Sequence, residues 1–291
     1  PIEIEKNDMQ ALLAVSRGSS EEPRFIILEH EGGSPDESPL VLVGKGLTFD
    51  AGGISIKPSS GMEDMIFDMS GGAAVIATLQ AVAALELNKN VIGLIPCSEN
   101  LINGRAMKPG DIIGSREGKT IEVINTDAEG RLILADALSY AQGFGPSAIV
   151  DCATLTGAVV IALGHHAAAV LGNDEDLVGA LGAGRPDLAA IDRIAGIGAL
   201  CLRLQTGGVE ARIGLCHGKT HLLLTGDDLG QVLLLLFFGA ELLQRLGAEN
   251  VQVNGRRTRK ARARARHRLH HQRRLGHAQP RAAVFLWPCH H

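Results

Sequence analysis

Short apolar runs recur along the first part of the chain, and most of them predict buried β-strands. An uninterrupted apolar run of about four to eight residues indicates a strand that is covered on both faces. We expect strands at residues 24–31, 40–47, 92–96 and 147–153. Small and apolar residues at helical spacing predict helices over residues 71–85 and 132–140. Because strands alternate with helices, we expect an α/β fold with a mostly parallel central sheet flanked by helices.

The start of the chain carries a weaker helical pattern. Four apolar residues between Met9 and Val15 predict the end of a linker helix within residues 1–18. No basic stretch followed by an apolar one, as in a signal peptide, occurs here. Pro1 is not an initiator residue, so we expect a fragment or a processed form.

The pattern changes after about residue 178. The following residues are rich in Gly, Ala and Leu and show no clear period, apart from residues 222–246, where we expect a helix. The apolar run inside that helix is far too short to span a bilayer, so we expect no membrane segment. The chain thus divides into a lead-in at 1–37, a core at 38–178, a divergent part at 179–250 and a tail at 251–291.

The tail has an unusual charge. Residues 251–291 contain eleven Lys or Arg residues and no acidic residue. Since the whole chain has 28 basic and 32 acidic residues, the first 250 residues hold the remaining 17 basic and all 32 acidic ones. Such a block of like charge predicts a poorly ordered tail. Three interpretations remain open: an arm that binds nucleic acid, a segment that docks on the acidic body, or out-of-frame translation of a GC-rich gene.

Composition also bears on the core and the compartment. The chain is 45% hydrophobic but only 3% aromatic, so its core must consist mainly of Ala, Val, Ile and Leu. None of the five cysteines has metal-type spacing, and Cys97 and Cys152 lie in apolar strands. We therefore expect reduced core cysteines in a cytoplasmic protein.

The main candidate for chemistry is the stretch at residues 125–132, Asn-Thr-Asp-Ala-Glu-Gly-Arg-Leu. It follows a predicted strand end at 121–124 and opens the helix at 132–140. Open α/β sheets bind ligands outside the carboxyl ends of their strands, and a helix N-terminus adds unpaired N–H groups. From these residues alone, both a cation site and a capped turn remain possible.

A second acidic group lies upstream. Asp50 follows an apolar run and precedes a glycine pair, and Asp68 precedes the helix at 71–85. Lys45 and Lys57 flank Asp50. Carboxylates gathered at strand ends repel one another unless cations neutralise them, and hydrolases often use two divalent ions about 3.5–4 Å apart. Oxygen ligands suit Zn, Mn or Mg without distinguishing among them.

These segments together resemble the leucyl aminopeptidase (cytosolic aminopeptidase) family. Residues 125–132 match the family's hallmark without a gap, and the resemblance runs from about residue 38 to about 178. The family's later Gly-Gly-Arg and Trp-x-His-Leu-Asp segments have no counterpart after that. The other matching stretches are Gly44–Lys57, Asp68 with its helix, Glu99-Asn100, Gly104–Ala106, Pro109–Asp111 and Asp151–Ala158.

The resemblance implies a two-metal aminopeptidase that releases N-terminal, leucine-like residues from peptides. Asp50 and Glu129, one from each acidic group, would bridge the ions, and Asp127 would contribute its carbonyl as well. The implied ligands are Lys45, Asp50, Asp68 and Glu129 for one ion, and Asp50, Asp127 and Glu129 for the other.

The resemblance also implies roles for the surrounding residues. Lys57 would polarise the scissile carbonyl, and Arg131 would hold a bicarbonate that acts as general base. The pocket for the substrate's N-terminal side chain would lie near Met62, Thr154, Leu155 and Gly157.

The family assembles as homohexamers, so we expect a homo-oligomer. The alternative from another class is a catalytically impaired relative that acts as a metal-binding or DNA-binding protein.

Overall fold

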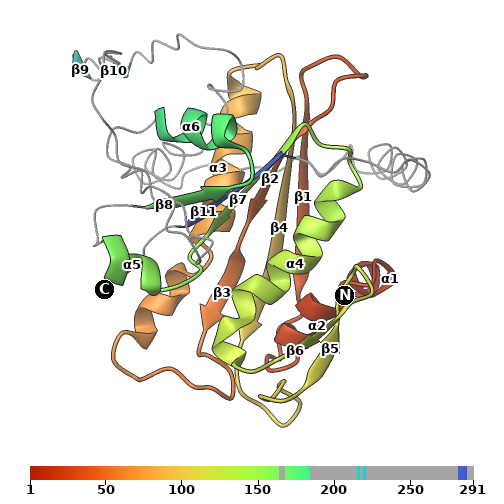
Figure 1. The fold of residues 1–291 in the computed structure, drawn as a ribbon, viewed down its shortest axis with the longest axis vertical. Coiled ribbons are helices and arrows are strands. Elements are labelled where there is room, and N and C mark those ends of the chain that lie inside the picture. Colours follow the sequence, from red (N-terminus) through yellow and green to blue (C-terminus); the bar gives the residue numbers. More distant parts are fainter. Residues whose placement is uncertain (164–167, 184–214, 217–218, 221–280, 287–291) are drawn as a thin grey trace.

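The apolar runs form one mixed β-sheet at the centre of the molecule (Figure 1). The structure is a computed structural model that describes residues 1–163, 168–183, 215–216, 219–220 and 281–286. Within these residues the sheet has seven strands in the order β1-β4-β2-β7-β11-β8, and β3 also pairs with β4. The strands are β1 (Arg24–Glu31), β2 (Leu40–Gly44), β3 (Gly46–Asp50), β4 (Asn90–Asn100), β7 (Ala148–Ala153), β8 (Ala169–Gly172) and β11 (Arg281–Leu286).

The interior of the sheet is parallel and its edges are antiparallel. β4, β2, β7 and β11 run in the same direction, whereas β1 is antiparallel to β4 and β8 is antiparallel to β11. Parallel strands need cover on both faces. The expected α/β fold with a mostly parallel sheet is therefore confirmed.

Helices cover both faces, and alternate residues of β2 point to opposite sides. Val41 and Val43 join a core cluster with α2 (Gln10–Ser16) and α4 (Glu129–Gln142). Leu40 and Leu42 join a second cluster with α3 (Ser70–Ala84) and α6 (Glu175–Ala183). The remaining elements are α1 (Ile2–Lys6), α5 (Ala158–Leu163), η1 (Met62–Phe67), η2 (Thr126–Ala128) and the strands β5 (Ile112–Gly114), β6 (Thr120–Glu122), β9 (Leu215–Cys216) and β10 (Lys219–Thr220).

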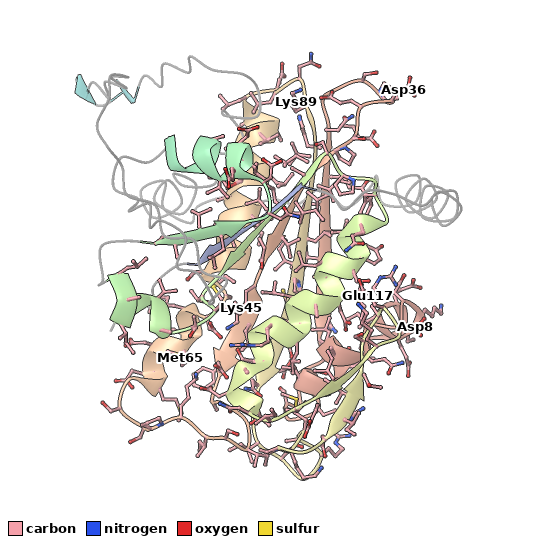
Figure 2. All side chains as sticks on the ribbon, viewed as in Figure 1. Asp8, Asp36, Lys45, Met65, Lys89 and Glu117 are labelled. Atoms are coloured by element: carbon pink, nitrogen blue, oxygen red, sulfur yellow. The ribbon has the colours of Figure 1, made fainter. Side chains whose placement is uncertain are left out.

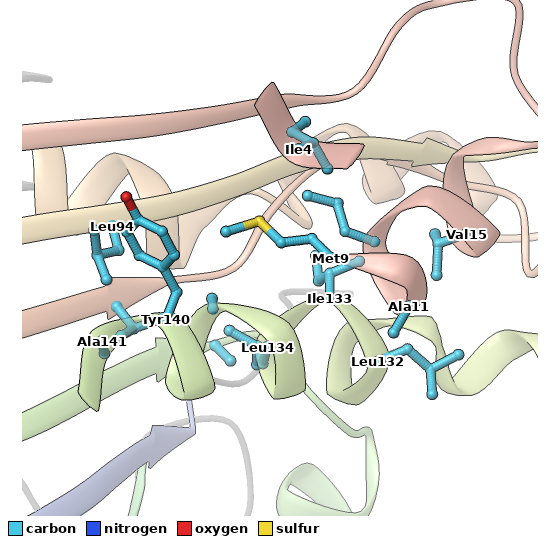
Figure 3. Packing of buried hydrophobic residues seen from close by; sticks show 14 of the residues in the cluster. Ile4, Met9, Ala11, Val15, Leu94, Leu132, Ile133, Leu134, Tyr140 and Ala141 are labelled. Atoms are coloured by element: carbon cyan, nitrogen blue, oxygen red, sulfur yellow. The ribbon is translucent and has the colours of Figure 1, made fainter. Parts of the chain in front are cut away.

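The first residues of the chain belong to the main core. The expected linker helix is two short helices, α1 and α2, because the backbone turns at Asp8, whose φ is 55°. Met9 is 1% exposed and lies between Ile4 and Ile133 in Figure 3. β1 follows and pairs with β4 over its whole length. The lead-in at 1–37 is thus packed together with the predicted core.

A buried carboxylate joins the N-terminal segment to α4. Asp136 lies on α4 and is completely buried. Its Oδ2 accepts hydrogen bonds from the backbone N–H groups of Ala11 (2.9 Å) and Leu12 (3.0 Å), and its Oδ1 accepts one from Arg116 N–H (2.8 Å). Ala11 and Leu12 lie in the first turn of α2, where N–H groups have no partner within the helix. Asp136 therefore caps α2 from the neighbouring helix.

Two predicted strands differ from the observed ones. The strand expected at 121–124 is β6, which pairs antiparallel with β5 in a separate small sheet. The hallmark stretch therefore follows a hairpin and not a strand of the central sheet. The strand expected at 40–47 is interrupted at Lys45, whose N–H donates to Cys152 O (2.9 Å) and whose carbonyl accepts from Gly72 N–H (2.8 Å).

The tail contributes one strand. We expected residues 251–291 to be poorly ordered, but Arg281–Leu286 form β11, which pairs with β7 and β8. Apart from its arginine, this segment is apolar, as a strand with neighbours on both sides requires. The rest of the tail lies outside the described residues, as does the helix expected at 222–246.

One helical stretch among the described residues is long and apolar enough to cross a membrane. It is Met62–Ala84, which combines η1 and α3, with a mean hydropathy of 1.4. Length and composition alone are weak support for a span, because core helices share them. Val75, Leu79 and Val82 pack in the second core cluster, and this contact with the sheet accounts for the apolar character of α3.

Replacing Asp136 should destabilise the fold. Asp136→Ala would leave two buried backbone N–H groups and one half-buried one without this acceptor, and each such loss costs about 1–3 kcal/mol. We expect urea denaturation to show a loss of at least about 3 kcal/mol in the free energy of unfolding. Asp111→Ala is the control, because the Asp111 carboxylate also accepts a backbone hydrogen bond, from Lys108, but near the surface. Equal losses in the two variants would contradict the capping role.

Candidate metal centre

Segments far apart in the sequence bring the predicted acidic residues together. Asp50 ends β3, and Asp68 lies two residues before α3. Asp127 lies in η2, and Glu129 begins α4. Oxygen atoms of Asp50, Asp127 and Glu129 all lie within 4.8 Å of one another. Three of the expected metal ligands thus form one cluster, and Asp68 is joined to it through a lysine.

Lys45, which is labelled in Figure 2, is the lysine that makes this connection. Its Nζ lies 2.8 Å from both carboxylate oxygens of Asp68 and 2.9 Å from Glu129 Oε1. It also donates to the Thr154 carbonyl at 2.9 Å. Burial alone would lower the pKa of Lys45, but the charges of Glu129 and Asp68 outweigh it and raise the pKa. The ammonium is therefore the favoured form in this arrangement.

Lys57 pairs with the other two carboxylates. Its Nζ lies 2.9 Å from Asp50 Oδ2 and 2.6 Å from Asp127 Oδ1. Burial would lower the pKa of Lys57, but the hydrogen bonds to Asp127 and Asp50 raise it. With 21% of its side chain exposed, against 3% for Lys45, Lys57 is the lysine on the accessible side of the site.

Negative charge is in excess at the site. Four carboxylates share two ammonium groups, and three of the four are buried. Burial raises the pKa of Glu129 to about 7 and also raises the pKa of Asp68, in both cases against the opposing charge of Lys45. A buried carboxylate is stable only when cations or donors compensate its charge. The two lysines supply only part of that compensation.

An unpaired oxygen supports a cation at this place. Glu129 Oε2 is buried and has no hydrogen-bond partner among the described residues. Glu129 is also one of the three residues of the cluster with Asp50 and Asp127. Carboxylate oxygens are the donors that Mg and Mn prefer and that Zn accepts. The residues present therefore fit divalent metal ions. Lys45 would have to lose a proton to become a ligand, and a nearby dication favours that loss.

The first turn of α4 lies directly against Lys45. A Cβ atom added to Gly130 would lie 2.7 Å from Lys45 Cε and 2.9 Å from its Nζ. Real Cβ atoms essentially never come this close. Arg131 follows on the same turn, and its side chain is exposed. A side chain at position 130 would therefore have to displace the end of the Lys45 side chain from its contacts with Asp68 and Glu129.

The predicted pocket residues have different surroundings. Thr154 is buried, and its hydroxyl donates to Asp68 Oδ1 at 2.6 Å, so it contacts a predicted metal ligand. Leu155 is half-buried and would lie 3.2 Å from a Cβ on Gly130, whereas Gly157 is exposed with open space around it. Met62 begins η1 and is half-buried.

No role was predicted from the sequence for four buried residues near the site. Met65 is the buried methionine of η1, at 8% exposure. Asn100 and Thr126 are buried and polar. Both lie in segments that resemble the family, but the resemblance assigned no role to either. Asp151 on β7 is a further buried carboxylate, and burial raises its pKa to about 7. Asp151 could have been noticed in the sequence, because it is the one charged residue in the apolar strand at 148–153.

Comparisons with known proteins identify the family of this chain. A family model described as the cytosol aminopeptidase family, catalytic domain, matches residues 2–185, a wider range than the resemblance at 38–178. A probable cytosol aminopeptidase from Geotalea uraniireducens is 60% identical over 179 residues, which cover 62% of this chain and 36% of the relative. A protein of the same description from Alkalilimnicola ehrlichii is 59% identical, with the same coverage. One from Geobacter sulfurreducens is 58% identical over 176 residues, or 60% of this chain and 36% of the relative.

The matched part spans about a third of the length of these relatives. It contains all seven predicted metal-binding and catalytic residues, which lie between Lys45 and Arg131. Because the family model matches most of the chain, including the lysines and carboxylates of the site, this chain belongs to the cytosol aminopeptidase family.

Proposed function

We propose that this chain forms the metal site of an aminopeptidase that releases the N-terminal residue of peptides. The observation that carries the proposal is the cluster of Asp50, Asp127 and Glu129, joined to Asp68 through Lys45. The names of the relatives support the same activity. The catalytically impaired alternative is less favoured, because each of the predicted ligands is present in the cluster or beside it.

The acidic residues and Lys45 would hold two divalent ions of Mn, Zn or Mg, which when bound would polarise the peptide carbonyl and lower the pKa of a water molecule. Lys57 lies at the accessible side and would donate a hydrogen bond to the carbonyl oxygen as negative charge develops there. Its raised pKa keeps it protonated at neutral pH, as this role requires. Asp50 and Asp127 hold the ammonium in place through the contacts already described.

Arg131 would bind a bicarbonate ion that acts as general base. The guanidinium group is planar and can donate two parallel hydrogen bonds to a planar carbonate. The exposed position of Arg131, two residues after Glu129 on α4, is consistent with a small anion at the edge of the cluster.

The substrate's N-terminal side chain would lie near Met62, Leu155 and Gly157, with a preference for leucine-like residues. Thr154 would contribute mainly by orienting Asp68, to which its hydroxyl donates.

Assembly and location are also proposals. A homohexamer follows from the family resemblance, and a cytoplasmic location follows from the word cytosol in the names of the relatives. Binding of nucleic acid by the basic tail is a separate proposal. Within that tail the structure describes only β11, and the other basic residues lie outside the described part.

Hydrolysis of leucine p-nitroanilide tests the activity. The purified chain with Mn²⁺ or Zn²⁺ should release nitroaniline, and Asp127→Asn should lower kcat/KM by about 100-fold or more, the upper range for disturbing a metal site. Asp111→Asn, on an exposed loop, should leave the rate unchanged. Metal binding without turnover in the unmodified chain would instead support the non-catalytic alternative.

Gly130→Ala tests the contact between α4 and Lys45. Alanine favours a helix by about 1 kcal/mol over glycine, but here its methyl group must displace the Lys45 side chain. We expect isothermal titration calorimetry to show Mn²⁺ affinity lowered about tenfold, within the range for changes beside metal ligands. Gly179→Ala in α6 is the matched control, because nothing lies within 4 Å of its added Cβ. Unchanged Mn²⁺ affinity in Gly130→Ala would show that this close approach does not matter to the site.

A further inference from the structure

A buried asparagine at the end of β4 contacts both acidic segments. Asn100 is 1% exposed. Its Nδ2 donates to Asp50 Oδ1 at 2.8 Å and to the carbonyl of Thr126 at 3.0 Å. Both neighbours are acceptors at these atoms, so only the NH₂ end of the amide can face them. One side chain thus connects the segment after β3 to the turn that carries Asp127 and Glu129.

The contacts of Asn100 also determine which oxygen of Asp50 is available. Asp50 Oδ1 accepts from Asn100 Nδ2 and from Gly52 N–H (2.9 Å). Asp50 Oδ2 is the oxygen that faces Lys57, at 2.9 Å. Since two donors occupy Oδ1, the carboxylate is held in one rotamer, with Oδ2 directed at the cationic side of the site.

Thr126 makes a second connection between the same segments. It is completely buried. Its hydroxyl donates to Gly52 O at 2.7 Å and accepts from Ser55 N–H at 2.8 Å. The loop of residues 50–57, which carries Asp50 and Lys57, is thereby fastened to the residue that precedes Asp127.

The packing around these two residues is tight. Gly53 has a φ of 66°, and an added Cβ would lie 2.8 Å from Asn100 Oδ1 and 2.9 Å from Thr126 Oγ1. The backbone of the loop therefore lies directly on both polar side chains. The loop cannot shift without breaking contacts with Asn100 and Thr126 together.

We infer that Asn100 and Thr126 are positioning residues that hold Asp50 and Asp127 at the spacing needed to bind metal ions. The inference rests on the proposed metal site and assigns a role to two residues that bind no metal themselves. Residues behind metal ligands commonly change metal affinity by 10–100-fold when they are replaced. These two residues connect ligands that lie more than seventy positions apart in the sequence.

The test compares the two asparagines at opposite ends of β4. Asn90 is also buried, and its Nδ2 also donates to two carbonyls, those of Ser34 and Glu37. Asn90→Ala and Asn100→Ala should both lower the Tm of the metal-free protein. Only Asn100→Ala should raise the Kd for Mn²⁺, by about 10–100-fold in isothermal titration calorimetry.

A second pair of variants separates the hydroxyl from the volume of residue 126. Thr126→Val keeps the shape and removes both hydrogen bonds of the hydroxyl, and it should weaken Mn²⁺ binding about tenfold. Thr126→Ser keeps the hydroxyl and should bind Mn²⁺ nearly as tightly as the unmodified chain. This pair decides the matter if Asn100→Ala does not fold.

Three results would overturn the inference. Mn²⁺ affinity in Asn100→Ala or Thr126→Val within twofold of the unmodified chain would show that the connection is not needed. Equal weakening by Asn90→Ala would trace the effect to general stability. If the unmodified chain bound no Mn²⁺, the proposed function would fail together with this inference. If the unmodified chain bound Mn²⁺ and Asn100→Ala bound it with the same Kd, only the inference would fail.

Discussion

Repulsion among carboxylates at one end of the sheet is the constraint on which the site depends. Four acidic side chains converge there, and three of them are removed from water. Each is therefore held by donors or cations: Thr154 and Lys45 on Asp68, Lys45 on Glu129, and Lys57 on Asp50 and Asp127. This compensation is incomplete, because four carboxylates share two ammonium groups. Residual negative charge on carboxylates that are held in fixed positions attracts divalent cations. It favours those ions that can be coordinated by the carboxylate oxygens.

The rest of the fold supplies rigid support for that charge. The break between β2 and β3 directs Lys45 out of the β4 ladder, with its backbone held by Cys152 and Gly72. Close approach of α4 at Gly130 then limits the space that the lysine can occupy. Asp136 fastens the same helix to α2 through backbone N–H groups. Precise placement of ligands requires such support, because a displacement of about 1 Å is enough to impair a site.

Much of the fold and the site could be predicted from the sequence, because apolar runs and a contiguous hallmark are local signals. The strand at 24–31 and the gathering of Asp127 and Glu129 with Asp50 are examples. Features that depend on distant partners could not be predicted. Residues 120–122 have the same strand pattern whether they join the large sheet or a hairpin, and β11 pairs with strands more than a hundred positions earlier. The role inferred for Asn100 depends on two acceptors that only the tertiary structure brings to its amide.

The cap formed by Asp136 has a consequence for how the molecule opens. The amides of Ala11, Leu12 and Arg116 all donate to one carboxylate on α4. Their exchange with deuterated solvent therefore requires that each amide separate from that carboxylate. Native-state exchange is governed by such local opening events, which differ in free energy from one part of a protein to another. These three amides thus report how readily α2 and the turn at Arg116 separate from the helix that carries Glu129.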